Sequence, residues 1–138
     1  RPKARWLYRL LLAPSTISDT DVVSSIKENN IEGYRQLQDN KYWTTSTWRW
    51  KQILWCLRWM AKIPYLKERF DCDDFASMFR VVTKLTGLTA VGEVTGEWIG
   101  VGPHAWGIIV ARDGVLMVEP QTMKIVDPTK YIPTLIVI

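Results

Sequence analysis

Cysteine and histidine are scarce in this sequence of 138 residues, which holds two cysteines, Cys56 and Cys72, and one histidine, His104. Two cysteines exclude a small fold held together by many disulfides, and they form no paired-cysteine zinc pattern. No run of about 18 apolar residues is present, which excludes a transmembrane helix. Because there is one histidine, any mechanism that requires an imidazole must use His104.

Internal repeats, low-complexity stretches and a visible secretory signal are also lacking. The composition is 47% hydrophobic, so the chain can bury a core of its own and is not a disordered tail. Its length predicts a single domain over residues 1–138. The sequence opens on Arg1 rather than methionine, from which we expect a processed or excised chain, and its free thiols favour a reducing compartment.

The net charge of +4 is distributed unevenly along the chain. Residues 1–70 contain 13 Lys and Arg against 6 Asp and Glu, whereas residues 71–138 contain 5 against 8. A basic first half would suit nucleic acid or another acidic partner. A solvated helix surface is the simpler explanation of the same surplus.

Three helices are predicted from the spacing of apolar residues and from capping residues, over residues 15–30, 48–62 and 72–86. Asp71 is the expected cap of the third helix, and Asp74, three residues later, completes a capping box. Cys56 lies inside the second helix, where we expect it to pack as a small hydrophobic residue, unbridged to Cys72.

After Gly87 the apolar period becomes that of strands, which we expect over residues 89–95, 104–110, 115–119 and 131–138. Residues 108–110 are continuously apolar, which predicts a strand covered on both faces. Pro133 favours an edge position for the last strand. The resulting fold class is α+β: a helical, basic, tryptophan-rich half over 1–70, then residues 71–138 with one helix and an antiparallel sheet, so that N-terminal helices pack on that sheet.

Five of the eight tryptophans fall in one short, basic stretch, at positions 43, 48, 50, 55 and 59. Such aromatics could stack nucleic-acid bases or line a sugar- or peptide-binding groove. They could equally enlarge the core of a small domain. Because those on one helix point in several directions, we expect most to be core residues and one or two to reach a surface cleft.

Three residues are candidates for chemistry: Cys72, His104 and Glu119. Cys72 begins a predicted helix, where backbone N–H groups and the helix dipole stabilise a thiolate. The neighbouring aspartates oppose that effect. His104 opens a strand next to a glycine-rich loop, and Glu119 ends an apolar strand, where a carboxylate needs a partner. Each residue taken alone is also consistent with a structural role.

The turn between the two central strands decides whether His104 and Glu119 meet. A four-residue loop over 111–114 pairs residue 110 with 115, places His104 opposite Gln121 and sets it diagonal to Glu119 on one face. A three-residue loop would put Glu119 on the other face. A two-residue turn at residues 113–114 would leave it farther along the strand.

Three short motifs follow in order: residues 71–76 (Asp-Cys-Asp-Asp-Phe-Ala), 103–106 (Pro-His-Ala-Trp) and 118–121 (Val-Glu-Pro-Gln). This pattern resembles that of transglutaminase-like cysteine peptidases. The Glu-Pro-Gln ending is similar to that of the papain-like, calcium-dependent cysteine protease domain of fungal chimeric agglutinins. The resemblance covers residues 71–121 and implies a papain- or transglutaminase-like core. Glu119 stands where most transglutaminase-like members have aspartate.

The resemblance implies a cysteine hydrolase, a peptidase or amidase with acyl transfer as an option, acting on a peptide or protein substrate through a thioester acyl-enzyme. Cys72 would be the nucleophile and its own backbone N–H an oxyanion donor. His104 would move the proton, and Glu119 would hold the imidazole tautomer.

Further residues would support this site. Gln121 is expected to be a polar support. Tyr65, Trp98 and Trp106 would wall the cleft, with core packing as the alternative for all three. No cofactor is required, but the aspartates Asp71, Asp73 and Asp74 could bind calcium, an option that the agglutinin resemblance favours. Helix capping explains two of these aspartates without a metal.

Two other functions remain open. The chain could be a catalytically inactive binding module that uses its tryptophan-rich basic surface to hold glycan, nucleic acid or protein. It could also be a structural component of a larger assembly. No membrane partner is indicated, and the motifs alone do not choose a substrate, an oligomeric state, or hydrolysis over acyl transfer.

Overall fold

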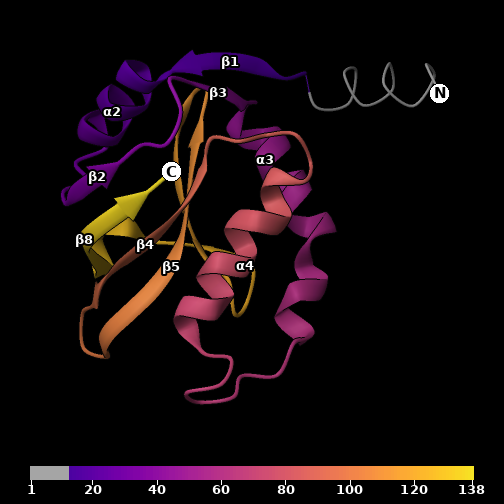
Figure 1. Cartoon of the computed structure of the whole chain (residues 1–138), viewed down its shortest axis with the longest axis vertical. Coiled ribbons are helices and arrows are strands. Elements are labelled where there is room, and N and C mark those ends of the chain that lie inside the picture. The colour runs from indigo at the N-terminus through magenta and orange to yellow at the C-terminus, as the bar shows by residue number, and fades with distance from the viewer. Residues whose placement is uncertain (1–12) are drawn as a thin grey trace.

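A six-stranded sheet forms the centre of the computed structural model, which describes residues 13–138 (Figure 1). The sheet consists, in spatial order, of β2 (Tyr34–Gln36), β8 (Tyr131–Val137), β4 (Val91–Trp98), β5 (Gly102–Ala111), β6 (Gly114–Glu119) and β7 (Lys124–Val126). A separate two-stranded sheet pairs β1 (Ser15–Ser18) with β3 (Lys41–Thr44).

The helices of the described residues are α2 (Asp19–Glu28), α3 (Thr47–Cys56) and α4 (Cys72–Lys84), with two short 3-10 helices, η1 (Arg58–Lys62) and η2 (Pro128–Lys130). Ser18 caps α2 and Ser46 caps α3, each by accepting a backbone N–H from the first turn. The helix that we predicted over residues 48–62 is divided at Leu57 into α3 and η1. Cys56, at the end of α3, is exposed, so the prediction that it packs inside is wrong.

The predicted fold class is wrong, because the molecule is mostly β and its main sheet is mixed rather than antiparallel. β2 runs parallel to β8, with Tyr34 opposite Leu135. Three strands, β1, β2 and β3, lie in the half that we expected to be helical, and they are only three or four residues long. Strands that short carry too little alternation to be recognised, and their partners come from distant sequence.

The last strand, β8, lies inside the sheet between β2 and β4, so the prediction of an edge strand is also wrong. The register of β4 and β8 shifts next to Pro133, because Thr95 pairs with Leu135 and Gly96 pairs with Pro133. Such a bulge interrupts the regular hydrogen bonds of the ladder, which is where a sheet tolerates a proline. Gly96 is required at this bulge, since a Cβ there would lie 2.1 Å from the carbonyl oxygen of Ile132.

Two hydrophobic clusters cover the two faces of the sheet. Trp106, Ile108 and Val110 of β5 belong to the cluster that includes Val22 and Ile26 of α2. Ile109 belongs to the cluster formed with α3 and α4, which includes Trp50, Leu54 and Phe79. Figure 1 shows α3 and α4 on one side of the sheet and α2 on the other. The continuous apolar run of β5 is thus explained, and the prediction that both its faces are covered is confirmed.

Helix α4 begins with the predicted capping box: the Asp71 side chain accepts from the backbone of Asp74, whose side chain accepts in return from the N–H of Asp71. Its apolar face packs on β4 and β5, with Phe79 fully buried. A Cβ on Gly107 would lie 2.3 Å from the Phe79 ring, so this glycine lets the helix approach β5 closely. The middle of α4 is thereby held against the sheet.

Candidate functional site

The hairpin of β5 and β6 brings His104 and Glu119 together. Residue 110 pairs with residue 115, which is the register that we predicted from a four-residue loop. The pairing continues to Ala111 and Gly114, so the turn itself is shorter than expected, but the register is unchanged. His104 Nε2 lies 2.6 Å from Glu119 Oε2, in a salt bridge whose two side chains are 8% and 7% exposed. The predicted pairing of these residues is confirmed.

Aromatic rings surround this pair, and solvent reaches little of either side chain. The His104 ring lies 5.2 Å from the ring of Trp98 and 6.4 Å from that of Tyr131. Burial, and secondly the negative charge of Glu119, raise the pKa of Tyr131. An ionised carboxylate only accepts hydrogen bonds, so Nε2 of His104 is the donor to Glu119. The carboxylate therefore fixes the ring orientation and the tautomer.

Only some of the residues that we predicted as supports contact the His104–Glu119 pair. The backbone N–H of Gln121, rather than its side chain, donates to Glu119 Oε1 at 3.2 Å. Trp98 packs beside His104. Trp106 is fully buried in the core, the alternative that the sequence left open, and its ring stacks on that of His104 at 6.2 Å. Tyr65 is exposed and stacks at 6.5 Å on Phe75.

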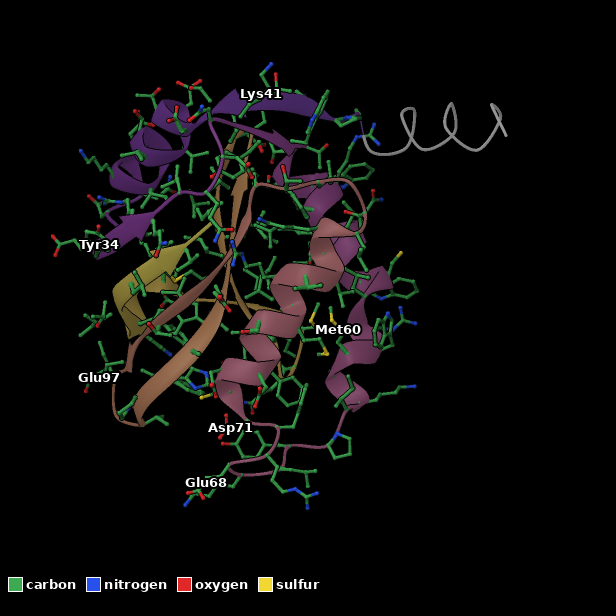
Figure 2. The ribbon with its side chains drawn as sticks, in the orientation of Figure 1. Tyr34, Lys41, Met60, Glu68, Asp71 and Glu97 are labelled. Carbon is green, nitrogen blue, oxygen red and sulfur yellow. The ribbon has the colours of Figure 1, made fainter. Side chains whose placement is uncertain are left out.

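Cys72 is a free, partly buried thiol at the first position of α4, and Cys56 is also free, so the prediction that they are unbridged is confirmed. In Figure 2, Asp71 marks this end of α4, and it lies at the same end of the molecule as Glu97 of β4. The environment is acidic: desolvation, and then the charges of Cys72, Asp71 and Asp73, raise the pKa of the Tyr65 hydroxyl. The roles of Cys72, His104 and Glu119 as one reacting set stay a prediction.

The aspartates at this helix end were the predicted calcium ligands. A carboxylate oxygen of Asp71, the Cys72 sulfur and a carboxylate oxygen of Asp73 lie within 4.8 Å of one another. The side-chain hydrogen bond between the two aspartates lowers the pKa of Asp71 and raises that of Asp73. Calcium prefers six to eight oxygen ligands, and two carboxylates beside a thiol fit that preference poorly. Calcium binding stays a prediction that these contacts do not strengthen.

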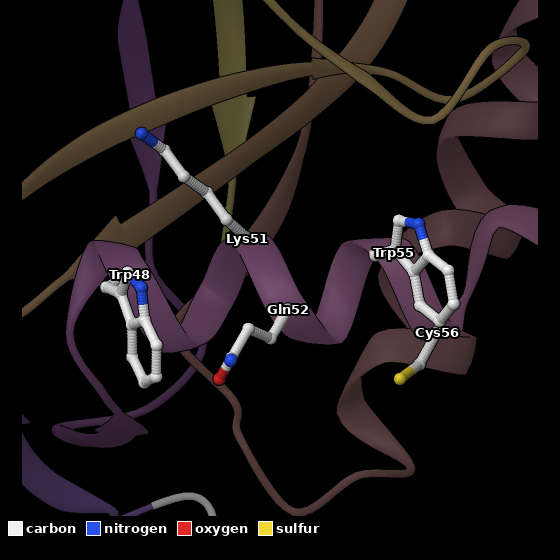
Figure 3. A pocket seen from close by; sticks show the side chains of 5 residues that line it. All are labelled: Trp48, Lys51, Gln52, Trp55 and Cys56. Atoms are coloured by element: carbon white, nitrogen blue, oxygen red, sulfur yellow. The ribbon is translucent and has the colours of Figure 1, made fainter.

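The exposed tryptophans of α3 line a second candidate site. Trp48 and Trp55 are 62% and 65% exposed, and together with Lys51, Gln52 and Cys56 they border an open groove of about 670 Å³ (Figure 3). These five residues follow the spacing i, i+3, i+4, i+7 and i+8, so they share one face of the helix.

Of the five clustered tryptophans, the core takes only Trp50, whose indole N–H donates to Thr44 Oγ1 at 3.0 Å. The remaining four, Trp43, Trp48, Trp55 and Trp59, are exposed. Our expectation that most would be core residues is therefore wrong. Sequence spacing identified a surface cleft on this helix but not how many aromatics would face solvent.

The chain has a fold that is also found in lectin structures. It superposes on a structure described as "PSL1a-E64 complex" with a TM-score of 0.74 at 22% identity, over 89% of this chain and 51% of that one. It also superposes on Polyporus squamosus lectin bound to the human-type influenza-binding epitope Neu5Acα2-6Galβ1-4GlcNAc, with a TM-score of 0.71 at 22% identity, over 89% and 49%. The chain thus spans about half the length of either neighbour. No protein-family model and no curated protein matches it.

These neighbours overturn the resemblance to transglutaminase-like and papain-like cysteine peptidases and the core that it implied. With it fall the assignments as a cysteine hydrolase, as an enzyme and as a thiol protease with a catalytic triad, because one of the two similar structures is of a lectin with a glycan bound. Some residues of the three motifs have structural roles that explain their presence. Asp71 and Asp74 form a helix capping box, and Glu119 is the hydrogen-bond partner of a buried histidine.

In residues 13–138, no helix has both the length and the apolar character needed to cross a bilayer. The apolar, basic segment at residues 6–12 lies outside the described residues.

Proposed function

We propose that this chain is a glycan-binding module and that the groove of α3 is its contact surface. The observation that carries the proposal is the pair of exposed indoles, Trp48 and Trp55, that border one groove on one helix face. Large apolar side chains that gather on a surface mark an interaction site. The lectin neighbours support the same class of ligand, since one of them is in complex with a sialylated glycan.

The chemistry of the groove suits a sugar. Indole rings offer flat apolar faces for the C–H faces of a sugar ring, and their N–H groups bond to hydroxyls. Gln52 supplies both a donor and an acceptor, and Lys51 supplies a donor. Small-molecule sites in general combine such an apolar lining with a few polar groups.

The length of the groove indicates more than one sugar ring. Trp48 and Trp55 are seven residues apart, which corresponds to about 10 Å along a helix axis. Because the groove is open, much of a bound sugar stays in contact with water, and we expect weak binding, with a Kd of about 0.1–1 mM for a trisaccharide.

The test is a titration of the full chain with Neu5Acα2-6Galβ1-4GlcNAc and with Galβ1-4GlcNAc, followed by tryptophan fluorescence and by NMR of the sugar protons. We expect Trp48→Ala and Trp55→Ala each to weaken binding about threefold to tenfold, because each removes one stacking face. Trp43→Ala is the matched control, since Trp43 is exposed but lies on β3 outside the groove.

Two outcomes would overturn the proposal. One is the absence of binding to both glycans, and to an array of neutral and acidic glycans, at millimolar concentration. The other is glycan binding that the two groove substitutions leave unchanged, which would move the site elsewhere on the chain.

A further inference from the structure

A second groove adjoins the tryptophan groove on the other side of Lys51 and Trp55. It has a volume of about 490 Å³ and lies between α3, the start of η1 and the segment that leads into β7. Lys51 and Trp55 line both grooves and therefore form the ridge between them. In Figure 3 the Lys51 side chain extends away from Gln52 and Cys56, from the edge of the helix face that lines the tryptophan groove.

The lining of this second groove carries positive charge without a balancing acid. Lys51, Arg58 and Lys124 contribute three cationic groups, and no Asp or Glu is among its lining residues. Within residues 13–138, no salt bridge joins any of the three to a carboxylate. Its floor is apolar, with Leu54 and Met123. The groove therefore combines an apolar surface with three cations available to an anion.

Arg58 is held in position before any ligand arrives. Its guanidinium carbon lies 3.5 Å from the centre of the Trp55 ring, and its Nη1 donates to the carbonyl oxygen of Trp55 at 2.8 Å. A guanidinium has five N–H donors in a fixed plane, so several remain after this bond. Such a group binds a carboxylate with two parallel hydrogen bonds, and prior positioning reduces the entropy lost on binding.

We propose that this groove recognises the carboxylate of an acidic sugar, so that the ligand of the chain is a carboxylated glycan with one ring against Trp48 and Trp55 and its acid across the ridge near Arg58. This inference rests on the proposed glycan-binding function and names its ligand class. Three cations are fewer than the six to ten phosphate contacts typical of nucleic-acid binding, so a single acidic group fits the site better.

The probes for the test are a hyaluronan tetrasaccharide, which carries carboxylates, and chitotetraose, which is neutral. Both are titrated into the full chain by calorimetry at low and at physiological salt. We expect the acidic probe to bind about fivefold to tenfold more tightly than the neutral one at low salt, because charge-assisted hydrogen bonds add to stacking.

Two variants test the second groove, here called the basic groove, independently of the tryptophan groove. Arg58→Gln and Lys124→Gln should each reduce the preference for the acidic probe, and the double variant, which keeps only Lys51, should lose most of that preference. Binding of chitotetraose should change less than twofold in Lys124→Gln, since Lys124 does not line the tryptophan groove. Lys67→Gln is the control, because Lys67 is an exposed lysine outside both grooves.

The outcomes separate this inference from the proposed function. Equal binding of both probes by the unaltered chain overturns the carboxylate inference and leaves the glycan-binding module intact. Absence of binding to either probe, together with failure of the first titration, overturns both. Tighter binding of a single-stranded oligonucleotide than of either glycan, with a steep dependence on salt, overturns the inference in favour of nucleic acid.

Discussion

The face of α3 and the end of the β5–β6 hairpin handle their unusual side chains in opposite ways. On α3, large aromatics are left in solvent, and three cations beside Trp55 have no salt-bridge partner among residues 13–138. At the hairpin end, a histidine and a carboxylate are buried and bonded to each other at 2.6 Å. Unsatisfied exposed groups are available to a ligand, whereas a satisfied buried pair is also explained by stability alone. The comparison teaches that reactive residue types indicate a function only where their side chains can still form hydrogen bonds or ion pairs with a ligand.

The largest contrast between the tryptophans of one helix should appear in stability. We expect Trp50→Ala to lower the free energy of unfolding by about 3–5 kcal/mol, because it opens a cavity in the core and removes the hydrogen bond to Thr44. Trp48→Ala and Trp55→Ala should change it by no more than about 0.5 kcal/mol. Urea unfolding of the three variants measures this. A large loss in Trp55→Ala would mean that the groove is part of the core.

The next effect concerns the hairpin end. We expect His104→Ala to cost about 3 kcal/mol at pH 7, because it leaves the carboxylate of Glu119 buried without its partner. Urea unfolding measures the loss, with His104→Gln as control, since its amide retains a donor for Glu119. An equal loss in His104→Ala and His104→Gln would show that packing of the ring, not its bond to Glu119, matters.

A smaller effect tests the link between the two regions. The backbone N–H of Thr47, at the start of α3, donates to Asp113 Oδ1 at 2.7 Å, in the turn of the hairpin. This bond, chiefly, lowers the pKa of Asp113. Its stabilisation is present above the ordinary value of about 3.9 and is lost as pH falls through the lowered value.

We therefore expect Asp113→Ala to be less stable than the unaltered chain at neutral pH, and the difference to vanish in strong acid. Denaturant midpoints from pH 7 down to pH 2 measure this, and Asp127→Ala is a control remote from α3, since the Asp127 carboxylate accepts from nearby Thr129 in η2. A difference that persists at pH 2 would contradict the assigned cause.

The smallest effect concerns the thiol. If Cys72 acts with His104, alkylation of Cys72 at pH 7 should slow a few-fold in His104→Gln, measured with iodoacetamide in a Cys56→Ala background. Identical pH profiles with and without His104 would show that Cys72 is only the first residue of a helix, and would sharpen the contrast between the two regions.

Local sequence determined more of this protein than its short strands suggest. The capping box of α4 and the two-sided burial of β5 could each be predicted, because capping and apolar spacing act between residues close in the chain. The register that joins His104 to Glu119 could be predicted too, since a short hairpin leaves few alternatives.

Only the tertiary structure decided the rest. β8 became an inner strand because β2, whose Tyr34 lies opposite Leu135, pairs with the edge of β8 that faces away from β4. Trp50 became a core residue and Trp55 a surface residue because the sheet covers only one side of α3. The sequence of the helix alone does not determine which side is covered. The basic groove likewise exists only where η1 and β7 meet α3. Contacts between distant segments depend on the packing of the whole chain, and a pattern read over a few residues contains no information about them.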